Sequence, residues 1–153
     1  MTSNVHVALY QPDIAGNTGT ILRTAACLGF HVHLIEPAGF DSSDRALKRS
    51  GMDYLAMATL TRHAEWTQFE AWRKEQMLLL TLLTTKASTP YTQNDLSIPQ
   101  ILMFGSESNG VPEHVHESAD QRITIPMQPD ARSLNLAISV GIVAAEAIRQ
   151  HQA

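Results

Sequence analysis

The sequence predicts an α/β fold, in which a single domain contains a mainly parallel β-sheet flanked by helices. Short apolar runs of strand length alternate with segments whose apolar residues recur at helical spacing, as in proteins with parallel sheets. The run 101–104 contains only apolar residues, which is typical of a strand covered on both faces. No linker, repeat or shift of composition interrupts residues 1–153, so we expect one domain.

The expected elements follow from residue type and from the residues that end each segment. Strands are expected at 5–10, 30–35, 60–62, 77–83, 101–104 and 122–126, where β-branched and other apolar residues cluster. Helices are expected at 20–28, 65–76 and 136–148, with short ones after Ser42 or Ser43 and after Pro112. Residues 13–19 are expected to form a loop, because their centre, 16–19, is rich in turn-forming residues.

The composition indicates a cytoplasmic protein with part of its surface withdrawn from water. Charged residues make up 17% of the chain, against roughly 25% in typical soluble domains. The apolar runs are too short to span a bilayer, so no membrane partner is expected, and residues 1–11 do not resemble a signal peptide. Cys27 is the single cysteine, which permits no intrachain disulfide, and we expect it to be a small core residue.

The last expected helix is apolar around almost its whole circumference until Glu146 and Arg149. A helix of this kind is buried on more than one side. In a short chain, a second subunit is an expected cover. The low charged fraction points the same way, so the sequence predicts an oligomer.

The loops that follow two strands carry the candidate functional groups. Gly105 and Gly110 bracket Glu107 after the strand at 101–104, and Ser133 and Asn135 precede the last helix. Ligands bind at such strand ends in α/β proteins. The loop lacks the Gly-Lys-Ser/Thr ending of a nucleotide P-loop, so a neutral or cationic ligand with an adenine ring is favoured over a triphosphate.

Each of these residues also has an ordinary structural interpretation. Glu107 is either a solvated or capping carboxylate or a group that orients a loop or a substrate. Arg23 is either a solvated helix residue or a group that grips phosphate in a bidentate way. Ser133 is a normal helix N-cap. The histidines lack carboxylate or cysteine neighbours at metal-ligand spacing, so they are interpreted as structural or surface residues, and no metal is expected.

Three blocks of sequence, in order, resemble a known family. They are Asn17-Thr18-Gly19 followed by Arg23, the pattern F-G-x-E-x-x-G-x-P at 104–112, and I-P-M at 125–127 followed by S-x-N-L at 133–136. The chain is similar to the SPOUT superfamily of methyltransferases, and within it to the compact tRNA 2′-O-methyltransferases of the TrmL/YibK-like group.

The resemblance implies a fold, a cofactor and a set of site residues. It implies a deep trefoil knot at the C-terminus, a homodimer formed through the terminal helices, and S-adenosylmethionine as cofactor. The cofactor contacts implied are Leu83, Gly105, Ile125 and Ser133. The catalytic residues implied are Asn17, Arg23, Glu107 and Asn135.

A net charge of −4 argues against a general nucleic-acid-binding protein, and DNA is not an expected partner. An RNA substrate would therefore need a local basic patch. Arg45, Lys48 and Arg49 fall at i, i+3 and i+4 on one helix face, and Arg62 could lie nearby. This face is either an ordinary solvated surface or a contact for RNA phosphates.

The expected reaction is methyl transfer to the ribose 2′-hydroxyl of the wobble cytidine or uridine in the tRNA anticodon loop. An unpaired loop nucleotide is reachable without opening a duplex, which suits a small protein. Two alternatives stay open: a SPOUT methyltransferase acting on another RNA, and a non-catalytic, flavodoxin-like nucleotide-binding domain.

Overall fold

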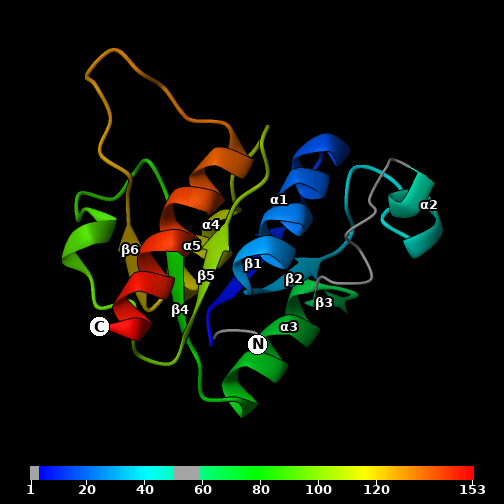
Figure 1. Ribbon diagram of the computed structural model, residues 1–153, viewed down its shortest axis with the longest axis horizontal. Coiled ribbons are helices and arrows are strands. Elements are labelled where there is room, and N and C mark those ends of the chain that lie inside the picture. The colour runs from blue at the N-terminus through cyan, green and yellow to red at the C-terminus, as the bar shows by residue number, and fades with distance from the viewer. Residues whose placement is uncertain (1–3, 50–58) are drawn as a thin grey trace.

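The computed structural model describes residues 4–49 and 59–153 (Figure 1). Its centre is a six-stranded sheet in the order β3-β2-β1-β5-β4-β6, with every neighbouring pair parallel. The strands are β1 (His6–Tyr10), β2 (His31–Ile35), β3 (Thr59–His63), β4 (Leu79–Leu83), β5 (Gln100–Phe104) and β6 (Gln121–Ile123). The predicted α/β class and its mainly parallel sheet are confirmed.

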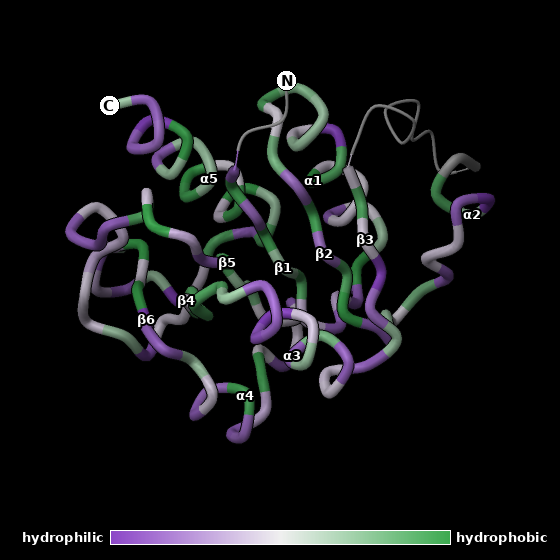
Figure 2. Tube along the Cα trace, turned by 90° about the horizontal axis from the view of Figure 1, so that it is seen from below, coloured by the Kyte–Doolittle hydropathy of each residue, from purple (hydrophilic) through white to green (hydrophobic). Residues whose placement is uncertain are grey.

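Helices cover both faces of this sheet (Figure 2). They are α1 (Ala15–Leu28), α2 (Asp44–Arg49), α3 (Trp66–Glu75), α4 (Glu113–Ser118) and α5 (Leu136–Gln152), with a single 3-10 turn, η1 (Tyr91–Gln93). Figure 2 shows α1 and α5 on one face and α3 and α4 on the other, so the domain has three layers. Ser43 caps α2 as expected, because its hydroxyl accepts a hydrogen bond from the Ala46 N–H at 3.2 Å.

Two separate cores arise because successive strand residues point to opposite faces. On the α1/α5 face, Val7 and Leu9 of β1 pack with Leu22 of α1 and Val143 of α5. On the α3/α4 face, buried residues of the same strands pack against Phe69 of α3, which is fully buried. The central strand β5 is buried at all five positions, as expected of a strand covered on both sides.

Three sequence predictions are wrong. Helix α1 begins at Ala15, so most of the loop expected at 13–19 is helical. Asn135, not Ser133, is the N-cap of α5, because its side chain accepts from the Ile138 N–H. Cys27 is exposed, because it lies on the outward side of α1, one turn after the exposed Arg23.

The outer surface of α1 and α5 keeps apolar side chains in contact with solvent. The two helices pack side by side (Figure 1). Exposed fractions reach 49% for Ile14, 46% for Leu28 and 55% for Ile138. Across residues 4–49 and 59–153, no helix has both the length and the apolar character that crossing a bilayer requires.

Candidate active site

A pocket of about 510 Å³ opens at the carboxyl ends of β4, β5 and β6. The chain runs outward from β1 through β2 to β3 and then returns to place β5 on the other side of β1. The loop after β1 leads to α1 on one face, and the loop after β5 leads to α4 on the other. Ligands bind in α/β proteins where connections diverge in this way.

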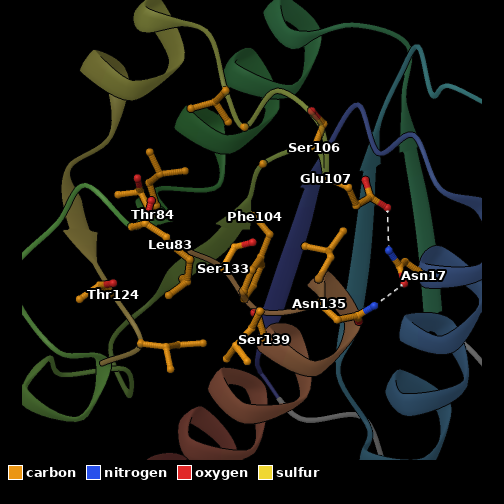
Figure 3. Close-up of a pocket in the computed structure, with 18 of the residues that line it drawn as sticks. Asn17, Leu83, Thr84, Phe104, Ser106, Glu107, Thr124, Ser133, Asn135 and Ser139 are labelled. Carbon is orange, nitrogen blue, oxygen red and sulfur yellow. Dashed lines mark hydrogen bonds between the residues drawn. The ribbon is translucent and has the colours of Figure 1, made fainter. Parts of the chain in front are cut away.

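Three loops and the start of α5 form the walls of the pocket (Figure 3). Leu83 ends β4 and Thr84 follows it, Phe104 ends β5, and Thr124 follows β6. Such a mixture of apolar walls and a few polar groups is typical of small-molecule sites, and the volume lies within their range of roughly 300–1,000 Å³.

Glu107 joins the loop after β5 to the beginning of α1. Its two carboxylate oxygens accept from the backbone N–H of Asp13 at 3.0 Å and of Ile14 at 3.2 Å. Ile14, the N-cap residue of α1, has no side-chain group that could do this itself. A carboxylate is favourable at the positive end of a helix, which explains why α1 begins earlier than its local sequence predicts.

Asn17 and Asn135 extend this connection to α5. The Asn17 side-chain amide donates to Glu107 at 3.1 Å, and its oxygen accepts from the Asn135 amide at 3.0 Å (Figure 3). Asn135 in turn caps α5 through the Ile138 N–H at 3.2 Å. We call Glu107, Asn17 and Asn135 the Glu107 network. It ties one strand-end loop to the first turns of two helices beside the pocket.

A second contact stabilises the same loop. The Ser108 hydroxyl donates to the Asp13 carboxylate, and this hydrogen bond lowers the pKa of Asp13 below its ordinary value. Asp13 therefore stays ionised in the acid range next to the start of α1, where negative charge is stabilising.

The structure explains why position 105 requires a glycine, which the sequence alone did not show. A Cβ at this position would lie 2.6 Å from the backbone carbon of Gly110, so the loop closes on itself only with glycine here. Ser106 and Gly110 exchange backbone hydrogen bonds at 2.9 and 3.0 Å, and Gly110 has a φ of +61°. Both glycines therefore shape the loop that presents Glu107.

The structure gathers most of the predicted site residues around this pocket. The residues that line it include Asn17, Leu83, Gly105, Glu107, Ile125, Ser133 and Asn135. Arg23 is exposed on α1, in the turns that follow Asn17, and the pocket wall does not include it in the described part of the chain.

The predicted basic face lies on α2, at the β3 end of the sheet and away from α5 and β6 (Figure 1). Arg45 is exposed. The side chains of Lys48 and Arg49 lie outside the described residues. Arg62 lies beside the start of α2, where its guanidinium contacts the Asp44 carboxylate at 2.6 Å and the Ser42 carbonyl at 2.8 Å.

Sequence reasoning missed several pocket residues. Thr84 and Thr85 follow the apolar strand β4, and this change from apolar to polar residues at a strand end was the available signal. Ser139 lies one helical turn after Asn135, on the same side of α5. Nothing in the sequence near residue 15 indicated that Glu107 contacts the start of α1.

The sequence matches the SpoU rRNA Methylase family over residues 4–145, which is most of the chain. The chain belongs to this family. Membership identifies it as a methyltransferase, and the alternative of a non-catalytic, flavodoxin-like domain is set aside.

Individual relatives are similar over nearly the whole chain. A tRNA (cytidine(34)-2'-O)-methyltransferase of Beijerinckia indica subsp. indica is 54% identical over 144 residues, covering 94% of this chain and 90% of the relative. A solved structure described as giving insights into the 2-OH methylation of C/U34 on tRNA is 37% identical, with a TM-score of 0.88 and coverage of 97% and 96%.

A third structure bears on the cofactor. An AdoMet-bound rRNA methyltransferase from Sinorhizobium meliloti has a TM-score of 0.86 and is 30% identical, covering 97% of this chain and 57% of that one. The family therefore includes a structural neighbour that binds S-adenosylmethionine on the same fold.

Proposed function

We propose that this protein transfers a methyl group from S-adenosylmethionine to the ribose 2′-hydroxyl of the wobble nucleotide, a cytidine or uridine at position 34 of a tRNA. The observation that carries the proposal is the pocket at the carboxyl ends of β4, β5 and β6, with the Glu107 network along its wall. The name of the 54% identical relative and the description of the 37% identical structure support this choice of substrate.

The pocket fits S-adenosylmethionine in chemistry and size. Leu83, Phe104 and Ile125 offer apolar surface for an adenine ring, while strand-end loops offer backbone donors and acceptors. When bound, the cofactor supplies a methyl group on a cationic sulfonium, which the ribose oxygen takes in a single displacement. We assign the cofactor contacts to Leu83, Gly105, Ile125 and Ser133.

The Glu107 network gives Asn17 and Asn135 fixed positions beside this pocket. An amide held by hydrogen bonds on both sides can present a donor or an acceptor to a ribose without reorganising, and such preorganisation lowers the barrier to transfer. In this assignment Glu107 is a positioning residue, because its carboxylate oxygens are already engaged by α1.

Arg23 is assigned to the tRNA, not to the cofactor. Its exposure on α1 leaves it accessible to a bound nucleotide, and a guanidinium can grip a phosphate in bidentate geometry. Since arginine stays protonated in proteins, Arg23 would align the nucleotide and lower the pKa of the ribose hydroxyl instead of removing its proton.

The exposed apolar surface of α1 and α5 supports a homodimer. Ile14, Leu28 and Ile138 are about half exposed, and they lie on the two helices that pack side by side. Apolar surface gathered in this way marks interaction sites, and a second copy would remove it from water. Sedimentation at micromolar concentration tests the assembly, and a mass equal to one chain would contradict it.

We assign tRNA phosphate contacts to Arg45, Lys48 and Arg49 on α2. Three basic residues in six give the acidic chain a local cationic segment. Each phosphate contact that is lost should flatten the log–log dependence of tRNA binding on salt by about 0.7 to 0.9. Replacing Lys48 and Arg49 with Ala tests this assignment, and an unchanged slope would move the contact surface elsewhere.

We also infer that the chain acts as one cytoplasmic domain whose C-terminal segment is threaded as a trefoil knot. Residues between β4 and β5 bond to Thr124 through Tyr91 N–H and Thr89 O at 2.9 Å each. The same segment bonds to Gln150 of α5 through the Leu96 N–H at 2.7 Å. The segment thus touches the chain on both sides of the connection from β6 to α5. A crystal structure with continuous density over 84–152 tests the threading.

The decisive experiment for the function is methylation of defined RNA. The protein is incubated with labelled S-adenosylmethionine and either bulk tRNA or ribosomal RNA, and digested nucleosides are separated. We expect 2′-O-methylcytidine and 2′-O-methyluridine, mapped to position 34 of tRNA. Label that appears only in ribosomal RNA would support the second candidate, which the family name and the Sinorhizobium meliloti rRNA methyltransferase favour.

A further inference from the structure

Four histidines gather on the α3 side of the sheet, away from the pocket. His6 lies on β1, His31 and His33 on β2, and His63 on β3, three strands that run side by side (Figure 2). The positions alternate with residues of the opposite core, so all four rings point to the same face. None of them lines the pocket at the carboxyl ends of β4, β5 and β6 within the described chain.

The rings of His6, His31 and His33 offer nitrogen atoms that converge. One nitrogen from each ring lies within 4.8 Å of the other two. The Nδ1 atom of His6 and the Nε2 atom of His33 are 3.1 Å apart. Two imidazole nitrogens on one tetrahedral metal ion, each at 2.0–2.1 Å from it, would be about 3.3 Å apart, so this pair is already at ligand spacing.

We propose that His6, His31 and His33 bind one divalent transition metal ion of the zinc type, which links β1 to β2. Neutral imidazoles are ligands that Zn²⁺, Cu²⁺, Ni²⁺ and Co²⁺ favour, whereas Mg²⁺ and Ca²⁺ prefer oxygen. The ion takes the place of the proton that His6 and His33 share. The ring of His31, which is only partly buried, stacks on His33 with centroids 4.2 Å apart and an interplanar angle of 13°, so it turns out of this stack to point a nitrogen at the ion.

The second nitrogen atoms of His33 and His31 also have hydrogen-bond partners. With Nε2 of His33 on the ion, its proton sits on Nδ1 and is donated to His63 Nε2, which lies 3.0 Å away. The His31 Nε2 atom lies 2.7 Å from the Thr61 hydroxyl. Metal-binding histidines usually donate this second N–H to a carboxylate, a backbone carbonyl or water, and here an imidazole and a hydroxyl take that place and fix the ring orientation.

The surroundings also keep the ligands ready. His33 has no exposed surface, and the Trp72 ring covers it at a centroid distance of 4.7 Å. These contacts hold the His33 ring beside His6 before an ion binds.

Calorimetry tests the site with ZnCl₂ as the probe. Untagged protein, stripped with a chelator and returned to a non-chelating buffer at neutral pH, should bind one Zn²⁺ per chain with micromolar or tighter affinity. His31→Ala and His6→Ala should each weaken binding at least about tenfold. His114→Ala is the matched control, because His114 is exposed on α4 outside the cluster, and it should bind Zn²⁺ as wild type does.

A second probe separates ligand loss from unfolding. Circular dichroism of each variant must match wild type, and Co²⁺ should give the visible absorption of a four-coordinate ion in wild type and His114→Ala but not in His31→Ala. No Zn²⁺ binding by folded wild type would overturn the proposal. So would equal affinity in folded His31→Ala, because the cluster would then be only a hydrogen-bonded part of the core.

Discussion

Two hydrogen-bonded chains of side chains connect neighbouring parts of this domain, and they differ in charge and in what they join. The Glu107 network links a strand-end loop to the first turns of α1 and α5, and it contains a carboxylate. The histidine chain His6–His33–His63 links three adjacent strands, and its central ring is buried under Trp72. The first lies beside the pocket and the second lies away from it.

The difference shows how each chain tolerates its surroundings. Glu107 is half-buried, and its carboxylate oxygens accept from the backbone N–H groups of Asp13 and Ile14 just before α1. Burial lowers the pKa of His33 to about 2, because it disfavours the imidazolium form. Disturbing the Glu107 network should therefore affect methyl transfer first, and disturbing the histidine chain should affect stability first.

The largest effect is expected at Arg23, which belongs to neither chain. Arg23→Ala and Arg23→Lys should both reduce methyl transfer to tRNA by a hundred- to a thousandfold, about 2.7 to 4 kcal/mol, because an ammonium cannot replace a bidentate fork. Cofactor affinity by calorimetry should stay within a few-fold.

Lys74→Ala is the control for Arg23, because it removes an exposed cation of α3 on the other side of the sheet. It should keep wild-type turnover. If Arg23→Lys keeps near-normal turnover, the bidentate contact is wrong and Arg23 supplies only a positive charge. If Arg23→Ala lowers the melting temperature and weakens cofactor binding, Arg23 has a structural role instead.

The next effect is expected at Glu107. Glu107→Ala removes the acceptor of three donors and should lower the free energy of unfolding by about 2 kcal/mol, measured by urea denaturation. Methyl transfer should fall with it, since α1 and Asn17 lose their anchor. Glu117→Ala, at an exposed position near the end of α4, should change stability by less than about 0.5 kcal/mol. If the two substitutions lower the free energy of unfolding equally, Glu107 does not stabilise the start of α1.

Acid should lower the free energy of unfolding by protonating the buried histidines. The folded pKa values of about 4 for His31 and about 2 for His33 lie below the ordinary 6.5, so the unfolded chain binds more protons in this interval. Stability is complete above about pH 6.5 and falls as pH decreases, with a slope of up to about 1.4 kcal/mol per pH unit for each histidine. His6 and His63 add to the effect, and His151 of α5 acts on His6.

Urea denaturation of metal-free protein between neutral pH and pH 5 measures this slope. The slope should be smaller in His31→Ala and unchanged in His114→Ala. A stability that does not vary over this range would show that the cluster is protonated in the folded protein.

A smaller effect is expected at the N-cap of α5. Asn135→Ala should cost about 1 kcal/mol of unfolding free energy, because the first turn of α5 loses its side-chain acceptor. Ser133→Ala should leave the unfolding free energy nearly unchanged, since Ser133 precedes the cap. The same urea measurement compares them, and a larger loss at Ser133 would reverse the assignment.

The features of the fold that could be predicted from the sequence are those that depend on local residue patterns. Strands β1, β2, β4 and β5 could be found from their apolar runs, whereas β3 and β6 were expected from short β-branched segments. The circumference of α5 indicated an apolar surface, and Ile138 is indeed 55% exposed. Pocket residues such as Leu83 and Ser133 came from the family resemblance, because a strand-end loop alone does not reveal which backbone groups face a cavity.

The start of α1 and the histidine cluster could not be predicted, because both depend on contacts between residues far apart in the sequence. Glu107 caps a helix whose first residues precede it by more than ninety positions, so no local motif announces that α1 begins at Ala15. His6 and His33 are 27 residues apart, and they meet only because β1 pairs with β2 in a particular register. Strand order and register are set by the whole fold, so the histidines looked unrelated in the sequence.

The central claim is that the Glu107 network assembles the methyl-transfer site from separate loops, and a double-mutant cycle on Asn17 and Asn135 tests it most directly. Methyl transfer to tRNA is measured at saturating cofactor for Asn17→Ala, Asn135→Ala and the double variant. The two amides share a 3.0 Å hydrogen bond, so their effects should couple by about 1 kcal/mol, and the double variant should be little worse than the poorer single one. Losses that simply multiply would show that the two residues act independently and would contradict the claim.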